Sequence, residues 1–288
     1  MSWQILLAIN LVFATVREFL SKKNANRLDP IIASFFFSLF TGILLIGYQL
    51  AVKGSWPRWD LSIMFSGLIF VAALISYFAA VKISLSQTIL FQSYSIVVTI
   101  LLSAIFLGEG QYLNIATSLG QRVIGGILMA FSALWFLLHE GGSKEQRLEK
   151  RWVGYILVHI LTGGIGTFIS IGLARKILPA EVFSNQSVAI VVLLGILMMW
   201  KKLPILQPKK VMQSLFLQSF AGTVALLSFY EALIQEAVAL VYPVQQVSLV
   251  VITMIIGIVV YKEQRVFSGK RLVGMVLGMA GIILLLTT

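Results

Sequence analysis

Four uncharged polar side chains interrupt otherwise apolar stretches of the chain: Asn10, Gln92, His159 and Gln246. Each lies about one-third of the way along its stretch. Amide groups both donate and accept hydrogen bonds, so they suit a small amphipathic or zwitterionic solute. The alternative for each residue alone is a hydrogen bond between helices, worth on the order of 0.6 kcal/mol in a membrane. Taken as a set, the four residues favour a substrate site.

Three further residues complete the predicted site. Tyr77 and Tyr230 are expected to add aromatic walls with hydroxyl groups, although tyrosines at the membrane interface are as common. Glu231 is the candidate proton-linked carboxylate, because partial burial disfavours the charged form of a carboxyl group. Arg17 and Glu18 are interpreted as interface residues that extend toward water at a helix end.

The residues needed for catalysis or metal binding do not occur in recognisable patterns. The two histidines, His139 and His159, are far apart and have no carboxylate at ligand spacing. The chain has no cysteine, which excludes disulfides and thiolate metal sites. No nucleophile with a base and no phosphate-binding loop is recognisable. The sequence therefore predicts no catalytic residue, no metal and no cofactor, and a protein that is not an enzyme.

Ten apolar stretches must position these side chains. A bilayer core about 30 Å thick needs around 20 apolar residues in a helix. Hydrophobic residues make up 59% of the chain and charged residues 11%, against about 25% charged residues in a soluble domain. The predicted spans are 3–20, 31–52, 61–81, 84–107, 116–138, 152–174, 182–200, 211–230, 237–261 and 268–286. The predicted fold class is all-α integral membrane, with ten transmembrane helices.

The basic residues are distributed unequally between the two ends of these helices. Of the 22 lysines and arginines, 17 fall in connectors on one side, and the net charge is +11. Positive residues in short connectors mark the cytoplasmic side, so both termini are expected outside the cytoplasm. This pattern explains the charge without nucleic acid, which we exclude as a partner. The expected location is the cell inner (plasma) membrane.

The two halves of the chain resemble each other. An offset of 149 residues places Trp152 on Trp3 and His159 on Asn10, and an offset of 154 places Gln246 on Gln92. Because each half has five helices, the second copy enters the membrane from the opposite side. The predicted parts are a first repeat at 1–138, a cytoplasmic connector at 139–151 and a second repeat at 152–288. Inverted repeats of this kind hold a substrate site near the bilayer midplane, where the halves meet.

Two pairs of segments resemble the end of an EamA repeat of the drug/metabolite transporter superfamily. In the first half they are IVVTILLSAIFLGEGQ (96–111) and RVIGGILMAFSALWFLL (122–138), and in the second VVITMIIGIVVYKEQ (250–264) and RLVGMVLGMAGIILLL (271–286). The second copy keeps Glu263 but has Lys262 in place of the preceding glycine, and neither copy has the family's early proline. The resemblance implies two inverted five-helix repeats around a central cavity, and movement of small metabolites, often outward.

These observations predict a secondary-active transporter of a small metabolite, amino-acid-like or another small amphipathic solute, that works by alternating access as an exporter. A flippase for a lipid or lipid-linked sugar is the alternative on the same scaffold. The expected partners are the small-molecule substrate and membrane lipids. A monomer suffices for this function, and Gly274-x-x-x-Gly278 offers a packing face between helices or between protomers of a dimer.

Overall fold

The computed structural model describes residues 1–83, 85–138 and 150–261, and seven residues between 273 and 284 (273, 276, 277, 280, 281, 283 and 284). Every regular element in this part of the chain is a helix. The elements are α1 (Trp3–Ala25), α2 (Pro30–Lys53), α3 (Leu61–Ser66), α4 (Leu68–Ile83), α5 (Leu85–Gln92), α6 (Ser95–Phe106), the short 3₁₀ helix η1 (Glu109–Leu113), α7 (Ser118–Leu138), α8 (Lys150–Ala174), α9 (Pro179–Trp200), α10 (Lys209–Gln235) and α11 (Val238–Tyr261).

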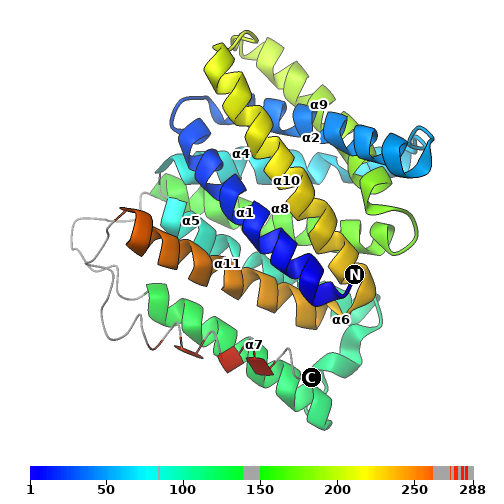
Figure 1. Cartoon of the computed structure of the whole chain (residues 1–288), viewed down its shortest axis with the longest axis vertical. Helices are drawn as coiled ribbons and strands as arrows, with labels where there is room; N and C mark the ends of the chain where they lie inside the picture. Colours follow the sequence, from blue (N-terminus) through cyan, green and yellow to red (C-terminus); the bar gives the residue numbers. More distant parts are fainter. Residues whose placement is uncertain are drawn as a thin grey trace.

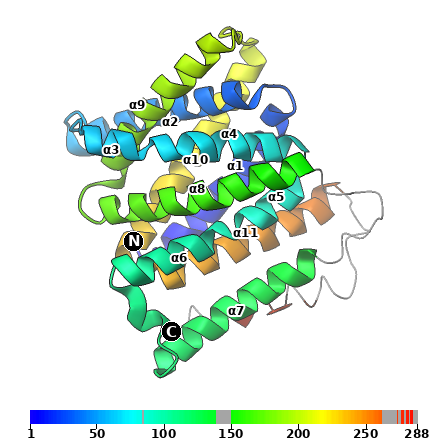
Figure 2. The same ribbon diagram turned by 180° about the vertical axis from the view of Figure 1, so that it is seen from behind.

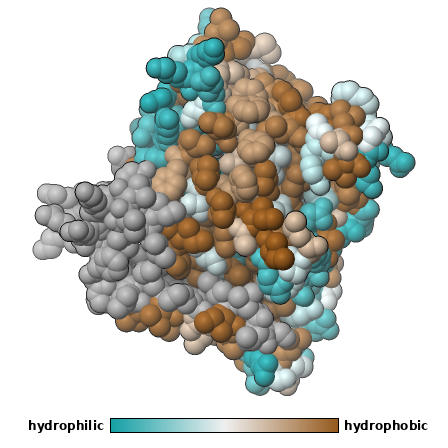
Figure 3. All heavy atoms as spheres, in the orientation of Figure 1, coloured by the Kyte–Doolittle hydropathy of each residue, from teal (hydrophilic) through white to brown (hydrophobic). Residues whose placement is uncertain are grey.

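The helices form an integral multi-pass membrane protein. Within the described residues, six spans are long and apolar enough to cross a bilayer: Trp3–Ala25, Pro30–Lys53, Leu61–Ile83, Arg151–Ala174, Pro179–Trp200 and Lys209–Gln235. A broad apolar surface covers the face formed by α1 and α10, and hydrophilic side chains gather toward the ends of the helices (Figure 3). The first nine predicted stretches coincide with helices of the described chain. Most of the tenth stretch, Glu263, and the predicted connector up to residue 149 lie outside the described residues.

Local sequence signals set several helix ends. Asp29 accepts a hydrogen bond from Ile31 N at 2.8 Å, and Pro30 occupies the first position of α2, where its missing N–H is not needed. At its other end, α2 stops at Gly54, whose φ of 65° favours glycine. Asp60 caps α3, and hydrogen bonds from the Ser62 hydroxyl and backbone N–H and from Ile63 N keep the pKa of this carboxyl below its usual value.

Two of the predicted spans are broken inside the membrane region. The third is interrupted at Gly67, between α3 and α4, where an added Cβ would lie 2.6 Å from the backbone oxygen of Gln186. Glycine is therefore needed here for the close approach of α9. The fourth is interrupted at Ser93–Tyr94, between α5 and α6. Interrupted helices in membrane proteins occur where the backbone lines a cavity or is covered by protein.

Long-range pairs of helices dominate the packing. The first helix, α1, lies along α10, α4 lies along α8, and α2 lies along α9 (Figure 1). Smaller contacts join α6 to α8 and α11 to α1. Figure 2 shows α7 at the edge of the bundle, where its neighbours are η1, α11 and α5. Each of the three main pairs joins a helix before residue 139 to one after it, so the two halves of the chain interlock.

Candidate functional site

A cavity of about 190 Å³ lies between the two halves. Helices α1, α2, α4, α5 and α6 contribute lining residues from the first half, and α8, α10 and α11 contribute from the second. Its polar or charged lining side chains are Arg17, Ser21, Gln92, Ser95, His159, Thr167, Gln218 and Gln246, and its aromatic ones are Phe37, Phe70, Tyr77, Phe78 and Tyr242. This lining combines hydrogen-bonding groups with ring faces, which suits a small solute with both polar and apolar parts.

Four residues singled out from the sequence line this cavity: Tyr77, Gln92, His159 and Gln246. The ring of His159 lies 5.6 Å from the ring of Tyr77 between centroids. Its Nδ1 donates to the backbone oxygen of Ala73 at 2.9 Å, because a carbonyl oxygen can only accept. Gln246 accepts a hydrogen bond from the Ser93 hydroxyl at 3.3 Å, at the interruption between α5 and α6.

The other three predicted site residues lie outside the lining. Asn10 is buried, and its Nδ2 donates to the backbone oxygen of Ala225 on α10 at 2.7 Å. Tyr230 is buried against Phe183, with ring centroids 4.5 Å apart. Glu231 is half-buried near the end of α10. Asn10 therefore forms a hydrogen bond between helices, which was the alternative to its expected role in substrate binding.

Glu18 does not extend toward water at a helix end, so that part of the prediction for Arg17 and Glu18 was wrong. The apolar stretch had been placed at 3–20, but α1 continues to Ala25, which puts both residues about two turns inside the helix. Glu18 is 1% exposed. Its carboxylate is paired with Arg17 and accepts a hydrogen bond from the hydroxyl of Tyr77, and Arg17 lines the cavity.

Gln218 is a polar residue of the site that was not predicted from the sequence. Gln218 of α10 donates from Nε2 to the Ser21 hydroxyl at 2.9 Å and accepts from Asn24 Nδ2 at 2.7 Å. Tyr242 hydrogen-bonds with the Ser95 hydroxyl at 3.4 Å. The available signal for Gln218 was an amide inside a long apolar stretch, the same signal that identified Gln92 and Gln246.

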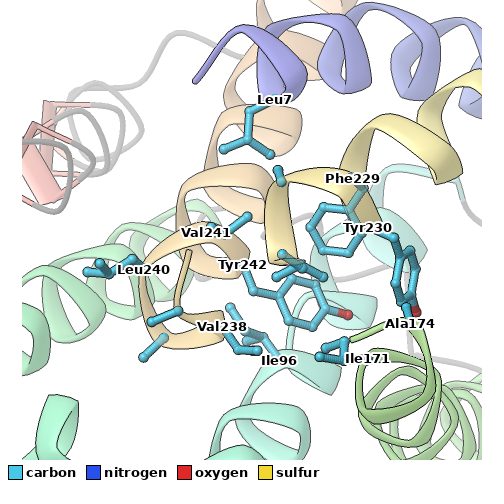
Figure 4. Close-up of a cluster of buried hydrophobic side chains, with 14 of the residues drawn as sticks. Leu7, Ile96, Ile171, Ala174, Phe229, Tyr230, Val238, Leu240, Val241 and Tyr242 are labelled. Atoms are coloured by element: carbon cyan, nitrogen blue, oxygen red, sulfur yellow. The ribbon is translucent and has the colours of Figure 1, made fainter. Parts of the chain in front are cut away.

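An apolar cluster lies at one end of the bundle, next to the cavity. We call the end where α1 begins and α8 ends the outer end, following the orientation expected from the basic residues. Buried apolar side chains pack together there, including Ile96, Ile171, Phe229, Tyr230 and Val238 (Figure 4). Beyond them, Glu109 pairs with Arg175 through one carboxylate oxygen and accepts from Val238 N at 3.0 Å through the other. This second bond satisfies a free N–H at the start of α11.

Within the described residues, no group of three or more His, Asp or Glu side chains is arranged to hold a metal ion. The cavity offers amide, hydroxyl, imidazole and guanidinium groups instead. These groups can orient and desolvate a solute by hydrogen bonds.

Comparisons with known proteins agree with this architecture. A solved structure described only as "Crystal structure of protein" has the same fold, with a TM-score of 0.74 at 15% identity, over 98% of this chain and 95% of the other. No curated protein matches the chain by sequence. Residues 150–287 match the sequence model of the EamA-like transporter family, a family of membrane transporters and not of enzymes. The second half of the chain is thus similar to the EamA-like transporter family, which is consistent with the resemblance of both halves to the drug/metabolite transporter superfamily.

Proposed function

We propose that the protein is a secondary-active transporter that moves a small amphipathic metabolite, such as an amino-acid-like solute, across the plasma membrane by alternating access, in the outward direction. The observation that carries this proposal is the polar cavity between the two interlocked halves. A hydrogen-bonding cavity inside an apolar bundle is costly unless it holds water or a solute. The family match over residues 150–287 supports transport as its use.

The proposed architecture is ten helices in two inverted five-helix repeats, at 1–138 and 152–288. Two hydrogen bonds support it. Asn10 on α1 donates to the backbone oxygen of Ala225 on α10, and His159 on α8 donates to that of Ala73 on α4. In each case the first helix of one half contacts the third helix of the other half. An inverted repeat requires such exchanged, equivalent contacts.

A short internal similarity strengthens this argument. The segment ALISYFAA (73–80) on α4 matches ALLSFYEA (225–232) on α10 at an offset of 152 residues. Ser76 donates to the backbone oxygen of Ala72 at 2.6 Å, and Ser228 donates to that of Val224 at 2.7 Å. The equivalent serines therefore make equivalent bonds in the two halves.

Alternating access needs a state that is closed at one end and open toward the other. The apolar cluster and the Glu109–Arg175 pair close the outer end. The lining residues Ser21, His159 and Gln218 lie on the parts of α1, α8 and α10 nearer the inner end. We infer that this is the inward-facing state, which loads solute from the cytoplasm.

The solute is small in this proposal. A cavity of about 190 Å³ suits a metabolite of amino-acid size better than a lipid-linked sugar. A flippase also needs basic residues presented to a headgroup. Lys82 is an exposed basic residue at the inner end of α4, but its Nζ donates to the backbone oxygen of Leu28, 3.4 Å away. We therefore favour transport of a small solute.

Transport is tested with the purified protein in two steps. Amino acids, nucleosides, sugars and amphipathic cations are screened by thermal shift, because a ligand that binds the native state raises its stability. The compounds that stabilise the protein are then loaded, radiolabelled, into proteoliposomes. The proposal expects saturable exchange of at least one compound that empty liposomes lack. Stabilisation without exchange of any compound would contradict it.

A further inference from the structure

Arg17 and Glu18 are charged residues well inside a membrane span. They are consecutive residues of α1, about two turns before its end at Ala25. The Nε of Arg17 donates to Glu18 Oε1 at 3.1 Å, and Arg17 Nη2 also contacts that oxygen. The other carboxylate oxygen accepts from the hydroxyl of Tyr77. The Arg17 side chain is 29% exposed toward the cavity, and the Glu18 side chain is 1% exposed.

A purely structural role explains this pair poorly. A charge near the centre of a membrane helix costs roughly 2.5–3.5 kcal/mol on insertion scales. An ion pair with a structural role would offset this cost by joining two helices. Arg17 and Glu18 are instead adjacent residues of the same helix. Among the hydrogen bonds of the described residues, the pair is joined to a second helix by the hydroxyl of Tyr77, and the Arg17 stem packs near Gly222 of α10. Replacing a buried ion pair by apolar residues of similar volume is often neutral or stabilising, so stability alone does not require these charges.

The geometry allows Arg17 to change partner. Consecutive positions on a helix do not face each other, so the guanidinium must fold back along the helix to reach Glu18. A rotation of its side chain suffices to turn it into the cavity. Among the described residues that line the cavity, Arg17 is the only lysine, arginine, aspartate or glutamate. A guanidinium matches a carboxylate with two parallel hydrogen bonds.

We propose that Arg17 binds a carboxylate group of the transported solute. When the cavity is empty, Glu18 pairs with Arg17. When the solute displaces Glu18 from Arg17, Glu18 takes up a proton. This inference rests on the proposed function. The displaced Glu18 would be an unpaired charge in a nearly dry position, which is far costlier than the neutral acid. The proton is taken up from the bulk solution through the water of the cavity, and it binds a carboxylate oxygen of Glu18. The solute carboxylate then balances Arg17.

Other titratable groups surround this pair and must be distinguished from Glu18. They are Tyr77 from α4, His159 from α8 and Tyr242 from α11. From α10 the nearby lining side chain is Gln218, which carries no charge. His159 is the one neighbour that titrates near neutral pH in its ordinary state. A test of proton uptake therefore needs a His159 variant beside the Glu18 variant.

The first measurement compares acids with their amides. Thermal-shift titrations use lactate and lactamide, glycine and glycinamide, and phenylalanine and phenylalaninamide, with wild type, Arg17→Gln and Lys22→Gln. We expect at least one acid to bind ten times more tightly than its amide, and Arg17→Gln to abolish the difference. Lys22 is the matched cation on the next turn; it donates to the backbone oxygens of Val81 and Lys82, so Lys22→Gln should keep the difference.

The second measurement counts protons. In weakly buffered solution, the acid that binds best should raise the pH by one proton per bound molecule. Wild type and Glu231→Gln should show this uptake. His159→Gln should bind the acid more weakly, because His159 lines the cavity, but at a saturating acid concentration it should still take up one proton per bound molecule. Glu18→Gln should bind the acid at least as tightly as wild type, because the internal competitor is gone, and take up no proton. This variant also keeps the test decisive if Arg17→Gln does not fold.

Three results would overturn the inference: no acid preferred over its amide in wild type, wild-type acid binding in Arg17→Gln, or unchanged proton uptake in Glu18→Gln. These outcomes differ from failure of the proposed function. If an amide or sugar is exchanged by proteoliposomes and the acids are not, the anion site is wrong and the transporter stands. If nothing is exchanged although an acid binds through Arg17, the proposed function is wrong and the anion site stands.

Discussion

Glu109 and Arg175 form an ion pair that joins the two halves of the chain at the outer end of the bundle. Glu109 follows α6 in the first half, Arg175 follows α8 in the second, and the same carboxylate accepts from Val238 N at the start of α11. Glu109 is 5% exposed. One carboxylate thus holds together three segments that must separate if the outer end opens.

Removing this charge should favour the outward-open state. Glu109→Gln keeps an acceptor for Val238 N but loses the attraction to Arg175. On an Ile171→Cys background, we expect at least a tenfold faster reaction of the cysteine with a maleimide, equivalent to a shift of about 1.4 kcal/mol. Ile171 is buried in the apolar cluster of the outer end. The control is Lys176→Gln, an exposed neighbouring cation. Equal reaction rates in both variants would show that the pair does not close this end.

Gly67 and Gly47 give a matched test of the contact between α3–α4 and α9. A Cβ at position 67 would lie 2.6 Å from Gln186 O, whereas nothing lies within 4 Å of a Cβ at position 47. Gly67→Ala should destabilise the protein by about 1–3 kcal/mol through overpacking. Gly47→Ala should be neutral or stabilising by up to about 1 kcal/mol, because alanine favours a helix. Thermal unfolding in detergent measures both, and equal midpoints would contradict the close approach.

Asn10 and His159, which the proposed repeat makes equivalent, should differ in function. Asn10→Ala removes one hydrogen bond between helices, so we expect a loss on the order of 0.6 kcal/mol in stability and unchanged solute affinity. His159→Ala should weaken solute binding, because His159 lines the cavity. The measurement is a thermal-shift titration of both variants with the same solute. A larger loss of solute affinity in Asn10→Ala than in His159→Ala would show that Asn10 belongs to the substrate site.

The orientation in the membrane can be measured directly, since the chain has no cysteine. Ser55 lies after α2 at the outer end, and Asn26 lies after α1 at the inner end; both are exposed. An impermeant maleimide added to intact cells should label Ser55→Cys and leave Asn26→Cys unlabelled until the cells are broken. The reverse pattern would contradict the orientation drawn from the basic residues.

The sequence predicted the elements better than it predicted which polar groups meet. Apolar length is a local property, so the spans were visible. The role of Glu18 depends on Tyr77, which lies 59 residues away, and on a helix that continues past its apolar stretch to Ala25. A short stretch of sequence around Glu18 shows neither of these facts. Asn10 shows the same limit, because the carbonyl that satisfies it belongs to Ala225 on α10.

One informative signal in the sequence was passed over. Single polar residues relate the halves at offsets of 149 and 154, but the run ALISYFAA (73–80) matches ALLSFYEA (225–232) at an offset of 152. It relates Ala73 to Ala225, the two backbone acceptors of the exchanged hydrogen bonds. A run of similar residues in equivalent helices is stronger evidence for a repeat than isolated matches.

The central claim is that the cavity between the halves binds the transported solute, and the affinity of Gln92 and Gln246 variants tests it most directly. The solute found by thermal shift is titrated against wild type, Gln92→Ala, Gln246→Ala and Gln245→Ala. Gln245 is buried on the same helix as Gln246 but does not line the cavity. The account predicts at least tenfold weaker binding, about 1.4 kcal/mol, in Gln92→Ala and Gln246→Ala and less than a twofold change in Gln245→Ala. Wild-type affinity in both lining variants would contradict it.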